Sequence, residues 1–157
     1  MGIEIERKFL VKKERWKEVN KTSGEMYRQG YLLTDPNKTI RVRQTNDKGF
    51  LTIKGISVGA SRAEYEYEIP WKEAEELLDQ FAVSELSKIR YKILFENKLW
   101  EIDEFLGDNE GLIVAEIELT SENETFTLPD WIGCEVTGEE RYYNSNLVIE
   151  PFVNWKL

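Results

Sequence analysis

Charged and apolar residues alternate along much of the chain, beginning with Ile-Glu-Ile-Glu-Arg-Lys at residues 3–8. Because a β-strand places residues two apart on the same face, Glu4, Glu6 and Lys8 would share one face and the apolar residues between them the other. Similar alternation, rich in β-branched and aromatic residues, recurs along the chain. It predicts strands at residues 2–10, 26–34, 38–45, 50–55, 62–69, 88–95, 98–105 and 112–120.

Short polar segments separate several of these predicted strands. Asp35-Pro36-Asn37, residues 46–49 and Glu96-Asn97 have the composition of hairpin turns, which favours antiparallel neighbours over crossover helices. About eight antiparallel strands can close into a barrel. The predicted fold is therefore α+β and β-dominated, an antiparallel closed β-barrel of about eight strands with a few flanking helices.

Helical periodicity is confined to two segments. We expect helices near residues 12–20 and at residues 71–82, where apolar residues fall on one side, and a short turn near Pro129. No repeat, low-complexity tract or linker divides the chain. Residues 1–157 are therefore expected to form a single domain, long enough to bury a core.

The spacing of like charges indicates what such a barrel would enclose. An ordinary sheet with one face in water would also alternate, with its apolar residues, here including Ile53, Tyr65 and Tyr67, buried. In this chain, however, charges of one sign repeat on the same strand face. The pairs are Glu4/Glu6, Arg41/Arg43, Glu64/Glu66, Lys88/Arg90, Glu101/Asp103 and Glu116/Glu118. Since like charges repel, acidic strands beside basic strands in a closed barrel would balance one another and leave room for a polyanion with cations.

Composition narrows the class of partner. A formal net charge of −9 and a pI near 4.8 disfavour a nucleic acid or an anionic membrane, because both reward positive charge. The chain has a single cysteine, Cys134, and neither an apolar leader nor a long apolar run. Together these features predict a cytoplasmic protein. The chain has no histidine, which excludes a Ser-His-Asp triad and most transition-metal sites. Clustered Asp and Glu instead select hard cations, Mg²⁺ first and Mn²⁺ next.

A lining of both signs suits phosphoryl transfer, which needs positioning and charge stabilisation more than covalent chemistry. Carboxylates would hold the metal, and arginines would bind phosphate through two parallel hydrogen bonds. A lysine would act as a point charge or, with a depressed pKa, as a proton acceptor. The expected ligand is a small phosphate polyanion bound together with cations.

The opening Glu4-x-Glu6-x-Lys8 resembles the signature of the CYTH superfamily, the triphosphate tunnel metalloenzymes. Further blocks follow in the family's order. They are Arg28-Gln29-Gly30-Tyr31-Leu32, Ile40-Arg41-Val42-Arg43, Leu51-Thr52-Ile53-Lys54, Arg62-x-Glu64-Tyr65-Glu66, Lys88-x-Arg90-Tyr91, Glu101-Ile102-Asp103-x-Phe105, Ala115-Glu116-Ile117-Glu118 and Gly133-x-Glu135-Val136-Thr137. The resemblance covers nearly the whole chain and implies an antiparallel β-tunnel that binds Mg²⁺ or Mn²⁺ and a triphosphate. Arg28 and Gln29 are consecutive residues and would point to opposite faces of a strand, so at most one of them faces inward.

The resemblance also implies a role for each matching position. Metal ligands would be Glu4, Glu6, Glu116 and Glu118, with Glu64, Glu66 and Asp103 as additional ligands. Phosphate contacts would be Lys8, Arg41, Arg43, Lys54 and Arg90. The catalytic residues would be Glu4, Glu6 and Lys88. Lys88 would help to activate water; alternatively it would bind phosphate, and the metal alone would lower the pKa of the water. At each of these positions the alternative is a purely structural role, in which the charged side chain forms an ion pair with a residue on a neighbouring strand. A helix end at residues 129–133 would plug the tunnel.

Members of this family include inorganic and thiamine triphosphatases, class IV adenylate cyclases and RNA triphosphatases. The compact chain is most similar to the short bacterial members, so metal-dependent hydrolysis of inorganic triphosphate is the favoured function. One alternative is a class IV-type adenylate cyclase or a nucleotide or thiamine triphosphatase on the same scaffold. Another is a non-catalytic protein that binds polyphosphate or nucleotide. The aromatic residues Trp71, Trp100, Trp131, Trp155, Tyr142 and Tyr143 are expected to pack on the barrel exterior rather than to hold a nucleobase.

Overall fold

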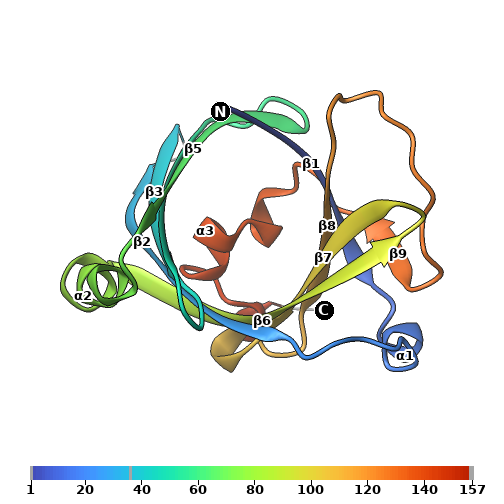
Figure 1. Ribbon diagram of the computed structural model, residues 1–157, viewed down its shortest axis with the longest axis horizontal. Helices are drawn as coiled ribbons and strands as arrows, with labels where there is room; N and C mark the ends of the chain where they lie inside the picture. Colours follow the sequence, from blue (N-terminus) through green and yellow to red (C-terminus); the bar gives the residue numbers. More distant parts are fainter. Residues whose placement is uncertain (1, 36, 156–157) are drawn as a thin grey trace.

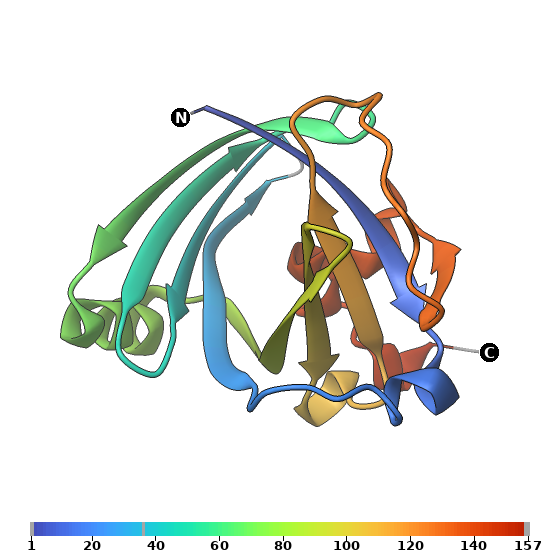
Figure 2. The ribbon, with the colours of Figure 1, turned by 45° about the vertical axis from the view of Figure 1, so that its right-hand side comes forward.

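The computed structural model describes residues 2–35 and 37–155, and in them nine strands form one antiparallel sheet. The strands are β1 (Ile3–Val11), β2 (Glu25–Asp35), β3 (Lys38–Gln44), β4 (Gly49–Gly55), β5 (Ser61–Ile69), β6 (Ser84–Phe95), β7 (Lys98–Phe105), β8 (Ile113–Glu118) and β9 (Ile132–Glu135). Their order is β5-β4-β3-β2-β6-β7-β8-β1-β9, and β1 also pairs with β5, which closes β1 to β8 into a barrel (Figure 1). The predicted barrel is confirmed, and β9 is an additional strand on β1. Figure 2 shows the strands curving around a common interior.

Most of the helices are short. They are α1 (Lys13–Trp16), α2 (Trp71–Phe81) and α3 (Asn144–Leu147), with 3-10 turns at Gly107–Asn109, Glu140–Tyr142 and Phe152–Asn154. The helix predicted at residues 71–82 is confirmed, whereas the one predicted near residues 12–20 spans only α1. Strand β6 begins at Ser84, earlier than the predicted residue 88. Pro36, in one of the predicted turns, lies outside the described residues. Within the described part of the chain, no helix is long and apolar enough to cross a membrane.

Apolar clusters on two sides of the barrel hold the flanking helices. One lies on β1, β7 and β8 and includes Trp16 of α1 together with the loop residue Trp131. Trp100 of β7 is fully buried, and its ring centroid lies 6.0 Å from that of Trp131. The other cluster joins α2 to β3 through Leu78 and Val42, and α2 accordingly lies outside the ring of strands in Figure 1. The exterior packing predicted for Trp100 and Trp131 is confirmed.

The outer faces of β4 and β5 are less covered than the alternation predicts. Ile53, Tyr65 and Tyr67, predicted to be buried, are 39%, 50% and 56% exposed. None of the buried clusters formed by the described residues includes them. The prediction is wrong at these positions because alternation of charged and apolar residues requires only that the inner face of the strand is enclosed. It does not require another element to cover the outer face.

The chain after β9 enters the barrel, where α3 lies within the ring of strands in Figure 1. Leu147, at the end of α3, is fully buried. It belongs to an apolar cluster with Leu86, Phe105, Leu112 and Val114. Several of these strand residues are in phase with the charged positions, so the cluster fills part of the barrel interior. The plug predicted at residues 129–133 is wrong, because Ile132 begins β9 and pairs with β1, and the later segment occupies the interior instead.

Candidate functional site

A polar cavity of about 300 Å³ lies inside the barrel. Every residue that the sequence places at the site lines this cavity, except Asp103. The structure adds to the lining Tyr31, Thr39, Arg62, Glu101, Asn144 and Ser145. Barrel closure explains the convergence, because it turns the inner faces of all the strands toward one space.

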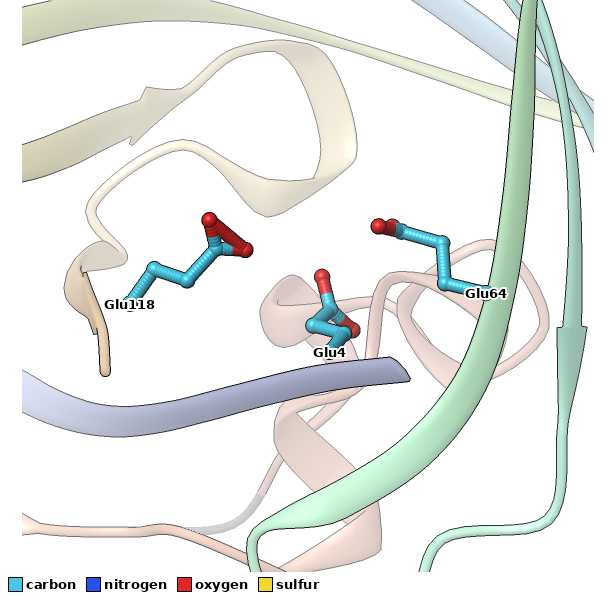
Figure 3. Close-up of side chains that lie close together, drawn as sticks. All are labelled: Glu4, Glu64 and Glu118. Atoms are coloured by element: carbon cyan, nitrogen blue, oxygen red, sulfur yellow. The ribbon is translucent and has the colours of Figure 1, made fainter. Parts of the chain in front are cut away.

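Three carboxylates from three strands meet at one side of the cavity. Glu4 of β1, Glu64 of β5 and Glu118 of β8 each offer an oxygen, and these oxygens lie within 4.8 Å of one another (Figure 3). Burial and the charge on Glu4 raise the pKa of Glu118 and also that of Glu64. Because a hard cation with oxygen ligands would relieve this repulsion, the donor set fits a divalent metal of that kind.

Two cationic side chains balance part of this acidic cluster. Lys54 Nζ lies 3.1 Å and 3.2 Å from the two carboxylate oxygens of Glu4, and 3.4 Å from Glu64 Oε2. Arg62 Nε lies 3.6 Å from Glu4 Oε1. Burial would raise the pKa of Glu4, but Lys54 and Arg62 outweigh it and leave that pKa below its ordinary value. Arg62 is missing from the predicted site, although it is in phase with Glu64 and parity could have identified it.

Glu6 and Glu116 form a second acidic pair on the wall of the cavity. Burial and the charges on Glu116 and Glu4 raise the pKa of Glu6 well above its ordinary value. Burial also acts to raise the pKa of Glu116, but the positive charges of Lys8, Arg90 and Lys88 lower it overall. The pKa values of these two neighbouring carboxyls are therefore shifted in opposite directions.

Arginines form a positively charged part of the wall. Arg41 and Arg43 project from β3, and Tyr27 lies between Arg43 and Arg90, with its ring centroid 4.9 Å and 5.1 Å from their guanidinium carbons. The Nε atoms of Arg41 and Arg43 are buried without a hydrogen-bond partner among the described residues. Burial, with repulsion from Arg41 and Arg90, lowers the pKa of Arg43 to about 10. Free buried donors beside unbalanced positive charge are what a polyanion would satisfy.

Lys88 is almost fully buried, and its amine forms an ion pair with Asp103 and donates a hydrogen bond to Asn144. Its Nζ lies 2.8 Å from Asp103 Oδ2 and 3.0 Å from Asn144 Oδ1. Asp103 also accepts two bonds from Arg90, at 2.7 Å and 2.9 Å, so cations engage both of its oxygens behind the cavity wall. Burial lowers the pKa of Lys88 to about 8, with Arg90 adding to the effect and Asp103 opposing it. Such an amine can lose its proton near neutral pH.

The segment after β9 contributes groups that the strand pattern does not indicate. Lys8 Nζ donates to the carbonyl of Tyr142 at 3.3 Å and lies 5.5 Å from the ring centroid of Tyr143. The expectation that Tyr142, Tyr143 and Trp155 pack on the exterior is wrong, because Tyr142 and Trp155 pack with the interior cluster and Tyr143 lies over Lys8. Arg141 is exposed and stacks on Trp155, with 3.9 Å between its guanidinium carbon and the ring centroid.

Of the adjacent Arg28 and Gln29, the glutamine faces inward. Gln29 is fully buried and donates to Asn144 Oδ1 at 3.2 Å. Arg28 forms ion pairs with Asp79 and Glu85, at 2.8 Å and 2.6 Å, on the other face of the strand. No spacing in the sequence connects position 144 with a strand residue, so this contact could not be predicted.

A second cavity, of about 580 Å³, adjoins the first. Thr39, Arg62 and Ser145 line both cavities. The wall of the second cavity also includes the ring of Tyr143, loop residues 56–57 and 59–60, and several hydroxyl groups. Its lining is thus less charged than that of the first cavity.

Known proteins share this architecture and much of the sequence. Residues 2–146 match the CYTH domain family. The chain is 56% identical over 157 residues to an inorganic triphosphatase of Acetivibrio thermocellus, covering 99% of each chain. It is 36% identical over 154 residues to an inorganic triphosphatase of Nitrosomonas europaea, covering 93% of this chain and 97% of the relative. A crystal structure of an inorganic triphosphatase superposes with a TM-score of 0.62 at 33% identity, covering 93% of this chain and 94% of that one.

Proposed function

The chain belongs to the CYTH domain family, and from that premise we propose that it is a metal-dependent triphosphatase whose preferred substrate is inorganic triphosphate. The observation that carries this proposal is the 300 Å³ cavity in which a carboxylate cluster and buried arginines and lysines share one space. A linear triphosphate would satisfy the free arginine donors, and a cation would join it to the carboxylates. The relatives described as inorganic triphosphatases match over nearly their full length, which supports the same activity here.

We assign the metal to Glu4, Glu64 and Glu118, the carboxylates whose oxygens converge. Further ligands would come from Glu6, Glu66 and Glu116, which line the same cavity. Mg²⁺ or Mn²⁺ suits an all-oxygen set. When bound, such an ion neutralises charge on phosphate oxygens and lowers the pKa of water.

The cationic lining would bind the phosphates. This set comprises Lys8, Arg41, Arg43, Lys54 and Arg90, and we add Arg62. Asp103 would orient Lys88 and Arg90 rather than bind metal, since both of its oxygens already accept bonds from them. Neutral Lys88 would take a proton from water as the water oxygen attacks a terminal phosphorus. The anhydride bond then breaks, giving phosphate and pyrophosphate.

Phosphate release from inorganic triphosphate, ATP and thiamine triphosphate tests this proposal, each assayed with Mg²⁺, Mn²⁺ or a chelator. We expect rapid release from inorganic triphosphate that requires the metal. If no substrate is cleaved although inorganic triphosphate binds in the presence of metal, the protein is a phosphate-binding protein and the proposal is overturned.

A second candidate function is turnover of a triphosphate that carries an organic group, such as a nucleoside or thiamine triphosphate. The 580 Å³ cavity beside the phosphate site favours it, because pockets of about 300–1,000 Å³ commonly hold small organic ligands. Faster phosphate release from ATP or thiamine triphosphate than from inorganic triphosphate would select this function. Pyrophosphate production from ATP without phosphate release would instead identify a cyclase.

A further inference from the structure

The amine of Lys88 is fixed by two acceptors on different elements. Nζ lies 2.8 Å from Asp103 Oδ2 on β7 and 3.0 Å from Asn144 Oδ1 on α3. A lysine ammonium has three N–H donors. The hydrogen bond to Asn144 and the ion pair with Asp103 occupy two sides of the amine and leave a third side free, and Lys88 lines the cavity. When the amine is neutral, its two N–H groups still serve the two acceptors. The lone pair then takes the remaining position.

The acceptor oxygen of Asn144 is itself held in place. Gln29 Nε2 donates to the same Oδ1 at 3.2 Å, and Gln29 is fully buried. Because two donors converge on one oxygen, the amide of Asn144 cannot flip without losing both bonds. Leu147, fully buried at the other end of α3, anchors the helix that carries Asn144.

We propose that Asn144 is a positioning residue that acts through Lys88 by keeping the free position of the amine directed into the cavity. The inference rests on the proposed triphosphatase function and deepens it by giving the short C-terminal helix a part in the reaction. Both hydrogen bonds of Asn144 to Lys88 and Gln29 use its oxygen, and an oxygen that already accepts two bonds does not attract phosphate. If Asn144 acts through Lys88, its removal should therefore lower the rate more than the substrate affinity.

Steady-state kinetics of Asn144→Ala in the full chain, with inorganic triphosphate and Mg²⁺, tests this role. We expect kcat to fall roughly 10- to 100-fold, the cost of misplacing a reacting group by about 1 Å, with KM changed less than about twofold. Asn146→Ala is the matched control, because Asn146 lies on the same helix and donates to the Glu140 carbonyl rather than touching Lys88. An equal loss of kcat in the control would overturn the proposal, as would a raised KM with unchanged kcat in Asn144→Ala.

A double variant separates action through Lys88 from a general structural effect. In a Lys88→Met background, adding Asn144→Ala should leave the residual turnover unchanged within about twofold, because no amine remains to be positioned. A further tenfold loss would overturn the inference.

Gln29→Leu gives an independent measurement should Asn144→Ala fold poorly. It removes the second donor to Asn144 Oδ1 and should lower kcat to a smaller extent without raising KM. An unchanged kcat in this variant would count against the proposed orientation of Asn144.

The wild-type protein, assayed in the same experiment, distinguishes the two levels of the proposal. If it cleaves no triphosphate, the proposed function fails and the inference fails with it. If it is active and Asn144→Ala matches it in kcat and KM, only the positioning role fails.

Discussion

Two buried cations of the site, Arg43 and Lys88, lie in different surroundings. Arg43 has a single long ion pair, 3.6 Å to Glu66, and a buried Nε without a partner among the described residues. Lys88 has close acceptors on two sides, Asp103 and Asn144. A buried charge that lacks partners is costly unless a ligand supplies them. We therefore expect Arg43 to act mainly through substrate affinity and Lys88 mainly through rate.

Arg43→Ala should weaken triphosphate binding with little change in kcat. Loss of a charge-assisted hydrogen bond is expected to cost ~1.5–3 kcal/mol, which corresponds to an increase in KM of roughly 10- to 150-fold. Arg28→Ala is the control, because Arg28 pairs with Asp79 and Glu85 outside the cavity and should keep the wild-type KM. An unchanged KM in Arg43→Ala would remove this residue from the phosphate site.

Turnover should depend on pH through Lys88. Because burial lowers the pKa of Lys88 to about 8, the amine is protonated below that pH and has no lone pair, and kcat should rise as the pH passes through this value. Lys88→Arg retains the positive charge but cannot deprotonate, so it should bind triphosphate and lose turnover at every pH. If Lys88→Arg keeps the wild-type kcat, Lys88 does not act as a base, and phosphate binding is its remaining role.

At the scale of elements, β1 decides how the barrel closes, because two strands share one of its edges. Residues Ile3, Glu4 and Ile5 pair with β5, whereas Phe9 and Val11 pair with β9. β5 and β9 therefore lie along different parts of this edge of β1. The wall of the second cavity includes residues from the loop before β5 and from the segment after β9. Room for a group larger than phosphate thus arises from the point where β1 changes partner.

The contact between α2 and β2 depends on a residue without a side chain. A Cβ at Gly30 would lie 2.8 Å from Leu78 Cδ2 and 2.9 Å from Ala82 Cβ, closer than packed carbon atoms approach. Gly30→Ala should therefore push α2 away and destabilise the fold by ~1–3 kcal/mol, lowering Tm by about 2–4 °C per kcal/mol. Gly55→Ala is the control, because its Cβ would meet only Ala63 Cβ at 3.5 Å. Equal Tm values for the two variants would contradict this account of α2 packing.

The molecule as a whole carries a net negative charge, and its interior cavity is lined by side chains of both charge signs. The formal net charge is −9, and the convergent carboxylates of Glu4, Glu64 and Glu118 repel one another within the barrel. Binding of a divalent cation should therefore stabilise the folded state as well as equip it for turnover, because the unfolded chain does not bring these carboxylates together.

Thermal unfolding with Mg²⁺ or Mn²⁺ and with a chelator should reveal this stabilisation. At a free metal concentration of about one hundred times Kd, the free energy of unfolding should rise by about 2.7 kcal/mol. For a domain of this size, that corresponds to an increase of roughly 5–10 °C in Tm. Glu118→Gln should lose most of the metal-induced shift and the turnover while keeping the fold, since it removes one ligand and also relieves repulsion. A full metal-induced shift in both Glu118→Gln and Glu4→Gln would contradict the metal assignment.

The alternation in the sequence determined the inner face of the barrel and most of the charged lining. Parity places Glu4, Glu6 and Lys8 together, and the closed barrel keeps them together because the period of a strand is two wherever it runs. The same parity misjudged Ile53 and Tyr65, since it reports which residues share a face and not what covers that face.

Tertiary structure alone decided what closes the interior and which carboxylates converge. Asn144 reaches Lys88 only because the chain turns back into the barrel after β9, and no local period encodes that return. In the same way, Asp103 bonds to Arg90 and Lys88, while Glu64 joins Glu118. Sequence fixes the face of each residue through local geometry, but contacts between residues far apart in the chain depend on how the strands are ordered and how the barrel closes.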